Sequence, residues 1–260
     1  MTNIFTAGTD KDQVPTLKAA FNMLLLSVGL IFFIWFSLWR IGHVLDFTFL
    51  ISLRIRVWDA FWLTVGLSAA SLGLSLFIGI VSATLQSGKV LILRYLFRFY
   101  VIVIRGTPLI TQIYLFYYIV GTAVGITNRF FSGVLILSVF EGAYIAEIIR
   151  GSLLSMDGTQ LEAAKAVGFT KRQTAAYVIL PQLAARTLPA LTGQAASLIK
   201  DSSLLSVISL IELTQTAREI SADHYNLFES FISLGALYLV LTLPVSYISK
   251  RLERRFNYET

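Results

Sequence analysis

Long uncharged stretches constrain the fold of this chain more than any other feature. Four of them run for 19 to 29 residues without a charged side chain: Phe21–Trp39, Ala60–Gly88, Gly106–Asn128 and Ser230–Ser249. A helix rises about 1.5 Å per residue, so each stretch is long enough to cross a hydrocarbon core of about 30 Å. Because the bilayer interior cannot hydrogen-bond an exposed backbone, we predict that all four are transmembrane helices.

Two further apolar stretches, residues 130–149 and 187–210, are interrupted by charges. Each contains two charged residues, which are Glu141 and Glu147 in the first and Lys200 and Asp201 in the second. Only 14% of the whole chain is charged, against about 25% in soluble proteins. Counting both stretches, the sequence predicts an all-α integral membrane protein with about six transmembrane helices.

The positive charges indicate how these helices are oriented. With both termini in the cytoplasm, 14 of the 21 Lys and Arg residues fall on inner segments and 5 on outer segments. Cytoplasmic loops of membrane proteins carry such an excess, so we predict an N-in, C-in topology. The net charge of +6 then needs no nucleic-acid partner, and the basic tail at residues 251–260 would lie beside anionic membrane lipid.

Several kinds of chemistry are absent from the sequence. There is no cysteine, which excludes disulfides, thiolate metal sites and cysteine nucleophiles. His43 and His224 lie far apart, so we predict no metal site. Asp223 and His224 are expected in a solvated outer loop.

The longest inner segment, residues 150–186, predicts a helix, a turn and a second helix. The run Glu-Ala-Ala-Lys-Ala consists of strong helix formers, and Gly168 suits the turn that follows it. Thr170 with Gln173 three residues later matches a capping box, which would begin the second helix. Pro181 is expected to close that helix.

This segment resembles the EAA motif of ABC importer membrane subunits. In that motif, EAA is followed by three residues, a Gly, nine residues and I-x-L-P. Here Glu162, Ala163 and Ala164 are followed by Gly168 and then by Val-Ile-Leu-Pro at 178–181, with one Val in place of Ile.

Three more phrases are similar to one branch of that family, the polar amino acid permeases of the histidine, glutamine, arginine and glutamate type. They are RGTPLxxQ at 105–112, GAYxAExxRG at 142–151 and LxKDTSLxSxI at 198–208, where Ser202 replaces Thr. The resemblance covers about residues 58–255. It implies three parts: residues 1–45 with an extra N-terminal span, a transporter domain at 46–250 with its coupling loop at 150–186, and the basic tail at 251–260.

The resemblance also implies partners and a location. Such a subunit sits in the bacterial cytoplasmic membrane beside a second, identical or related, membrane subunit. Two ATPase subunits bind Mg-ATP, and an external binding protein delivers a polar or charged amino acid. Glu162, Ala163, Ala164 and Gly168 would form the helix that docks on the ATPase. This chain has no GxxxxGK[ST] loop, so it is expected to hold no cofactor and to be no enzyme itself.

Charged and polar residues within the spans are candidates for the substrate path, because ionisable groups in a membrane are costly unless they serve a function. The candidates are Arg105, Glu141, Lys200, Asp201 and Ser202. Arg105 would either meet a substrate carboxylate or hold a helix end near the inner surface. Glu141 would either contact a substrate amino group or pair with Lys200 or Arg105. Glu147 and Arg150, three residues apart, are expected to pair with each other.

Two other functions fit an apolar helical chain. A secondary transporter driven by an ion gradient often shows inverted repeats, and no internal repeat is evident here. A membrane enzyme needs a convergent nucleophile, acid/base pair or metal set, and none is evident either. The ATP-driven importer is therefore the leading hypothesis, with the secondary transporter as its alternative.

Overall fold

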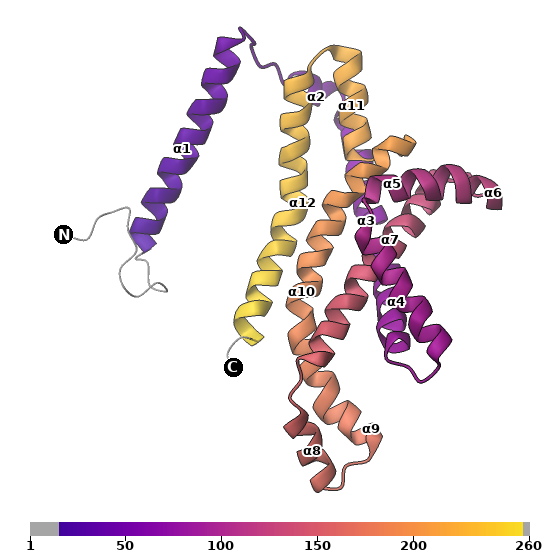
Figure 1. Cartoon of the computed structure of the whole chain (residues 1–260). Coiled ribbons are helices and arrows are strands. Elements are labelled where there is room, and N and C mark those ends of the chain that lie inside the picture. Colours follow the sequence, from indigo (N-terminus) through magenta and orange to yellow (C-terminus); the bar gives the residue numbers. More distant parts are fainter. Residues whose placement is uncertain (1–15, 257–260) are drawn as a thin grey trace. The chain divides into compact units, whose positions relative to one another are not determined.

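The computed structural model describes residues 16–256, and every element within that range is helical (Figure 1). The N-terminal segment before Thr16 and residues 257–260 of the predicted basic tail lie outside the described residues. The chain divides into two units, Met1–Phe47 and Thr48–Thr260. The elements are α1 (Thr16–Arg40), α2 (Phe49–Ser52), α3 (Arg54–Gln86), α4 (Leu91–Gly106), α5 (Leu109–Tyr114), a π-helix (Leu115–Gly121), α6 (Thr122–Val124), α7 (Arg129–Leu154), α8 (Gly158–Ala166), α9 (Lys171–Thr174), a π-helix (Ala175–Ile179), α10 (Leu180–Asp201), a 3₁₀-helix (Ser202–Ile208), α11 (Leu213–His224) and α12 (Leu227–Phe256).

The first unit contains the single helix α1. Most of its side chains are apolar, and none of those described is buried. Rings from four aromatic residues contact one another along its C-terminal half, at Phe32, Trp35, Phe36 and Trp39. A helix with so apolar a surface is suited to lipid.

Four described helices are long and apolar enough to cross a membrane: α1, α3, α7 and α12. Helix α4 and the segment Leu109–Val124 qualify together as a fifth if a bent pair counts as one span. The sixth predicted stretch is helical in α10, but Arg186, Lys200 and Asp201 lower its hydropathy. The structure therefore has four or five candidate spans, against the six expected.

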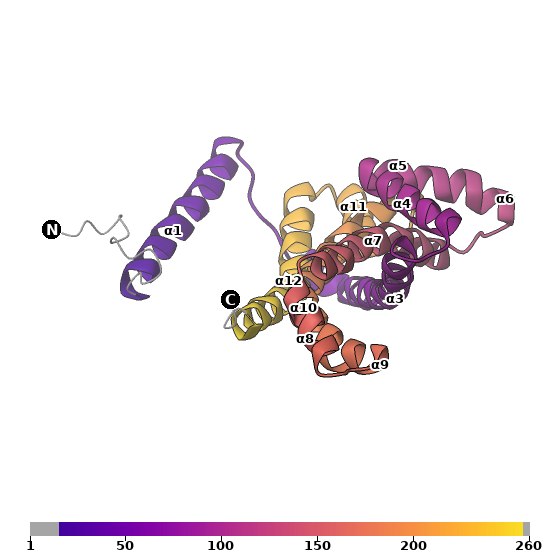
Figure 2. The same cartoon turned by 60° about the horizontal axis from the view of Figure 1, so that its bottom comes forward.

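The stretch predicted as a span at residues 106–128 is helical from Leu109 to Val124, but it does not continue the direction of α4. Helix α4 ends at Gly106, and the helical segment from Leu109 departs from its axis by 113°. Thr107 and Pro108 between them are extended, because proline lacks an N–H and disfavours helical backbone in the residue before it. The Gln112 side chain donates to the carbonyl of Ile104 at 2.8 Å and so satisfies a backbone acceptor that the break leaves free. Figure 2 shows α5 and α6 leaving the bundle sideways.

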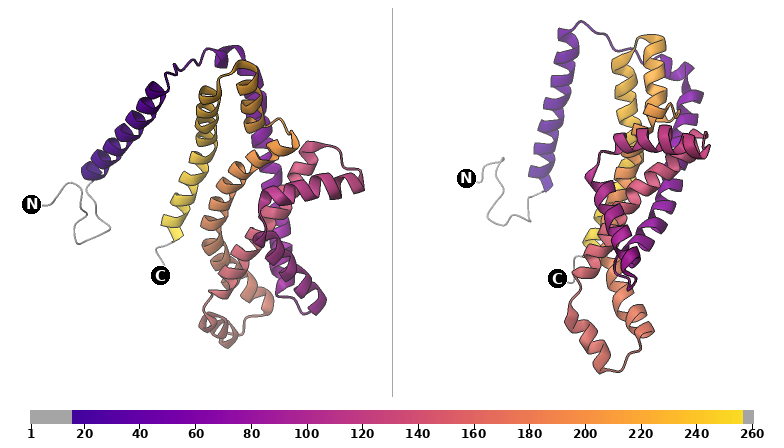
Figure 3. Two further views of the ribbon diagram at one scale, coloured as in Figure 1. Left: turned by 45° about the horizontal axis from the view of Figure 1, so that its top comes forward. Right: turned by 45° about the vertical axis from the view of Figure 1, so that its right-hand side comes forward.

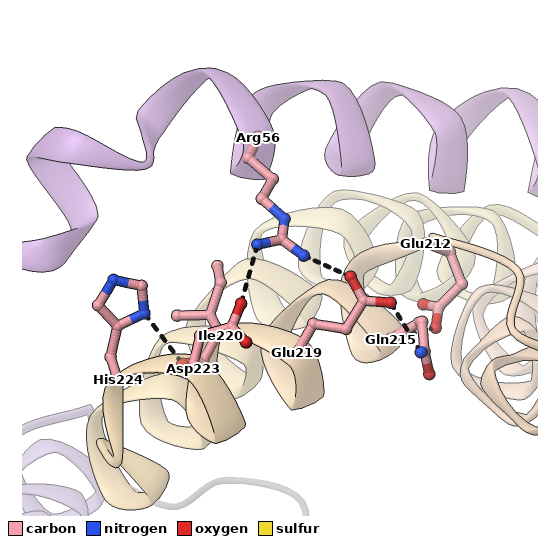
Figure 4. A network of polar contacts seen from close by, with 7 residues as sticks. All are labelled: Arg56, Glu212, Gln215, Glu219, Ile220, Asp223 and His224. Atoms are coloured by element: carbon pink, nitrogen blue, oxygen red, sulfur yellow. Dashed lines mark hydrogen bonds and ion pairs between the residues drawn. The ribbon is translucent and has the colours of Figure 1, made fainter.

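The N-terminal end of α3 is joined to α11 by ion pairs (Figure 4). Arg56 pairs with Glu219 and, at 3.5 Å, with Asp223. His224 ends the same helix, with its ring nitrogen 3.3 Å from the carbonyl of Ile220. Asp223 and His224 are exposed, as expected, but the expectation of a loop is wrong, because both belong to α11.

The second unit is built on close packing between α3 and α7, which make the most extensive contact of any helix pair. Glycines permit this contact. A Cβ at Gly79 would lie 2.4 Å from Cγ2 of Ile145 and 3.2 Å from the carbonyl oxygen of Gly142. A Cβ at Gly142 would lie 2.7 Å from Cγ2 of Ile78. Small residues at helix interfaces let backbones approach in membranes, where apolar association between helices is weak.

Substitution of Gly79 by Ala is expected to destabilise the protein by about 1–3 kcal/mol, because Ile145 is fully buried and has no space to move. The thermal unfolding midpoint of the purified chain in detergent should fall by several degrees. Gly73→Ala in the same helix is the matched control, since a Cβ there meets nothing within 4 Å. Equal midpoints for the two variants would show that the α3–α7 contact is looser than described.

Candidate functional site

A helical hairpin formed by α8 and α9 projects from one end of the second unit, opposite α11 (Figure 3). The expected helix, turn and helix are confirmed. Asp157 caps α8 by accepting from the Thr159 backbone N–H at 3.0 Å, and the hydrogen bonds from Thr159 hold the pKa of Asp157 below its usual value. Gly168 has a φ of +78°, which only glycine adopts without strain, and it turns the chain into α9. The capping box of Thr170 and Gln173 is present.

The expectation that Pro181 closes the second helix is wrong. The chain continues from α9 through a π-helical turn at Ala175–Ile179 into α10, and Pro181 lies in the first turn of α10. A π-turn inserts an extra residue into the helical ladder, which accommodates the N–H that proline lacks. The hairpin is therefore continuous with α10.

The residues of the EAA motif face two ways. Glu162 and Ala163 are exposed, whereas Ala164 is only 4% exposed. The carbonyl of Ala164 accepts from the Phe169 N–H at 3.0 Å, which closes the turn back onto α8. Ala164 therefore packs within the hairpin, and Glu162 with Ala163 presents its outer surface.

Side-chain hydrogen bonds fasten this hairpin to the helices on either side. Arg186 of α10 donates to the backbone carbonyl of Ser155, just after α7, and at 2.8 Å to its hydroxyl. Gln182 of α10 donates to the side-chain carbonyl of Gln160 in α8. Displacement of α8 would consequently move α7 and α10 with it.

Replacing Gly168 by Ala should weaken the hairpin by about 1 kcal/mol, because a side chain at positive φ is strained. Hydrogen–deuterium exchange of the amides in residues 158–174 reports this as faster exchange. Gly158→Ala is the control, since Gly158 has ordinary backbone and nothing lies within 4 Å of a Cβ there. Unchanged exchange in the Gly168 variant would mean that the turn does not hold the hairpin together.

A second group of polar residues lies between α7 and α10, within the bundle. Glu141 of α7 is fully buried and accepts a hydrogen bond from the Gln194 amide of α10. The carboxyl group of Asp201, two helical turns further along α10, is close enough to that of Glu141 to interact with it electrostatically. Glu141 Oε1 has no partner among the described residues. Two carboxyl groups therefore interact here, and one oxygen of Glu141 is left without a hydrogen-bond partner among the described residues.

The other candidates from the membrane stretches lie elsewhere. Lys200 is exposed, and Ser202 is buried with its hydroxyl donating to the Ile199 carbonyl at 2.7 Å. In the described part of the chain, neither Lys200 nor Arg105 pairs with Glu141. The site therefore gathers Glu141 and Asp201 and leaves the two candidate cations outside it.

Arg105 belongs to a cluster near the C-terminal end of α7. Its Nη1 lies 3.6 Å from Glu147 Oε2, and its guanidinium lies 5.3 Å from the centre of the Tyr144 ring. The expected pair of Glu147 and Arg150 is confirmed, with Arg150 Nε donating to Glu147 at 3.1 Å. Glu147 therefore joins α7 to α4 through Arg105 and pairs with Arg150 within α7.

Sequence reasoning missed Gln194, the only donor to Glu141 in the described residues. The available signal was spacing: Gln194 and Asp201 are seven residues apart, so they share one face of a helix. No group of three or more His, Asp or Glu residues that could hold a metal ion occurs within the part of the chain that the structure describes.

Comparison with known proteins places this arrangement among transporters. Residues 75–258 match the family described as binding-protein-dependent transport system inner membrane component. The glutamine transport system permease protein GlnP of Escherichia coli K12 is 34% identical over 213 residues, covering 77% of this chain and 97% of that protein. The L-cystine transport system permease protein TcyB of Bacillus subtilis is 34% identical over 195 residues, covering 75% and 83%. A crystal structure of an amino acid ABC transporter with histidines superposes with a TM-score of 0.75 at 31% identity, covering 82% and 99%.

Proposed function

The chain belongs to the family of binding-protein-dependent transport system inner membrane components, and we propose that it carries polar or charged amino acids into the cell as the permease subunit of an ABC importer. Membership places it in the inner membrane and assigns ATP hydrolysis to partner subunits. The cargo is supported by its relatives, since those compared are named for glutamine, L-cystine and amino acid transport.

The proposed assembly contains two membrane subunits, identical or related, two ATPase subunits that bind Mg-ATP, and one external binding protein. Within it, this chain crosses the membrane six times with both termini in the cytoplasm. The N-terminal part, residues 1–45, supplies an extra span, residues 46–250 form the transporter domain, and residues 251–260 form a basic tail at the inner surface. The excess of inner Lys and Arg and the apolar surface of α1 support this topology.

The proposed substrate contact is the pair of carboxyl groups at Glu141 and Asp201, with Gln194 positioning Glu141. Every amino acid carries an ammonium group that donates three hydrogen bonds, and a buried carboxylate with a free oxygen matches it. A buried carboxylate without a partner is costly, so the site favours a cationic group of the substrate when the path opens. Ser202 follows Asp201 along the same path, whereas Arg105 and Lys200 are assigned structural roles.

Coupling to ATP is proposed to run through α8, with Glu162 and Ala163 docking on the ATPase and Gly168 setting the turn. The hydrogen bonds of Arg186 and Gln182 would pass a movement of the hairpin to α7 and α10. These helices carry Glu141 and Asp201. At 1.5 Å per residue, Glu141 lies about 20 Å from the inner end of α7, so rigid-body motion of helices suffices to link the sites.

We expect Glu141→Gln to abolish or narrow the stimulation of ATP hydrolysis by amino acids. Removing the negative charge weakens the attraction for an ammonium group by about tenfold or more while the shape is kept. The measurement uses the chain reconstituted with its ATPase and binding protein in proteoliposomes, over a panel of amino acids. Glu253→Gln, an exposed carboxylate on α12, is the matched control.

Three outcomes would contradict the proposal at different points. Unchanged rate and selectivity in the Glu141 variant would remove this residue from the substrate site. Lack of stimulation of the wild type by any amino acid would remove amino acids as the cargo. Uptake that follows an imposed ion gradient and needs no ATP would favour the alternative, a secondary transporter.

A further inference from the structure

A cavity of about 560 Å³ lies between the inner ends of α3, α4 and α7, apart from the proposed substrate site. Its polar lining comes from Gln86 at the end of α3, Arg98 and Arg105 of α4, and Glu147 and Arg150 of α7. A second hollow of about 270 Å³ shares Gln86, Arg98 and Arg150 with it and adds Arg94. We call the two together the arginine cavity.

The arginine cavity has an excess of positive charge. Four arginines line it, and Glu147 is the one acidic residue among its lining. Arg105 and Arg150 share that carboxylate, and Arg94 donates to the Gly88 carbonyl at 3.0 Å. Arg98 makes no hydrogen bond or ion pair with any residue that the structure describes. Its guanidinium is therefore available to an anion.

Gln86 gives independent evidence for a ligand. Its side chain is only 3% exposed, and its amide nitrogen has no acceptor among the described residues. A buried donor without a partner costs about 1–3 kcal/mol, so native structures rarely leave one unpaired. The nitrogen is a donor only, which means that the group it needs must offer an acceptor oxygen. Together with the arginines, it specifies an oxyanion.

The surroundings of the cavity indicate where that oxyanion comes from. Helix α4 exposes a row of apolar side chains beside the arginines, at Leu96, Phe99 and Ile102, spaced along one face. Ile102 also lines the cavity. A ligand that places an anionic group among the arginines would therefore have its apolar part lie along α4. The Lys and Arg bias puts this end of the bundle at the cytoplasmic surface, where anionic lipids are enriched.

We propose that the arginine cavity binds the phosphate head group of an anionic phospholipid from the inner leaflet. Arg98 and Arg150 hold the phosphate oxygens, and the Gln86 amide donates a directed hydrogen bond. The acyl chains follow the apolar face of α4. A lipid bound there joins the ends of α3, α4 and α7 immediately before the hairpin that begins at Asp157.

The test is a titration of the purified, delipidated importer complex with phosphatidylglycerol, followed by native mass spectrometry and by the thermal unfolding midpoint. We expect Arg98→Gln to weaken phosphatidylglycerol binding about tenfold, because a charge-assisted contact is lost. Gln86→Leu should weaken it as well, without any change of charge. Arg251→Gln, which removes an exposed arginine on the same side of the membrane, should leave it unchanged. Arg98 is exposed and unpartnered, so its variant should unfold at the wild-type temperature without lipid.

Any of four other outcomes would overturn the proposal. Equal binding of phosphatidylcholine would remove the requirement for an anionic head group. Equal binding of soluble glycerol phosphate would identify a free phosphate ester as the ligand instead of a lipid. Equal losses of phosphatidylglycerol binding in the Arg98 and Arg251 variants would show that the positive surface attracts the lipid without a specific site. No bound lipid in the wild-type complex would mean that protein, such as a second copy of this chain, covers the cavity.

Discussion

The close contact of α3 with α7 is the constraint on which the rest of the second unit depends. Apolar side chains gain little by leaving lipid for protein, so helices in a membrane are held by packing and hydrogen bonds. Gly79 and Gly142 let the two backbones meet, with Ile78 and Ile145 filling the space on either side. Glu141 precedes Gly142, and the same packing that buries the glycine encloses the carboxylate.

From this pair, one continuous path leads to the proposed ATPase contact. Helix α7 carries Glu141 and ends beside the hairpin, and α10 begins at the hairpin and carries Gln194 and Asp201. Arg186 fixes the hairpin to the end of α7. Through these contacts, movement of α8 would be passed to both helices that carry the buried carboxyl groups. The glycine at 168 confines the one sharp turn to the exposed end of the hairpin.

Local features of this structure could be predicted from the sequence, and features that depend on distant contacts could not. The hairpin followed from helix formers, a glycine and a capping box that lie within a few residues of one another. The pair of Glu147 and Arg150 followed from helical spacing. The partner of Glu141 did not, because Gln194 lies 53 residues away. The break at Pro108 was identifiable as a possible helix end, but the 113° angle is set by the packing beyond it. The ion pair of Arg56 with Glu219 of α11 was likewise unpredictable, because the two residues lie 163 positions apart.

The most direct test of the central claim, that α8 docks on a separate ATPase, is a crosslink. The chain has no cysteine, so a single one placed at Ala166, an exposed position on α8, is unambiguous. It would be co-expressed with a candidate ATPase subunit carrying one cysteine in its docking cleft and treated with oxidant, with and without ATP. We predict a disulfide-linked product whose yield changes with ATP. No product with any cognate ATPase, in a folded and inserted protein, would contradict the docking role of α8 and favour a transporter driven by an ion gradient.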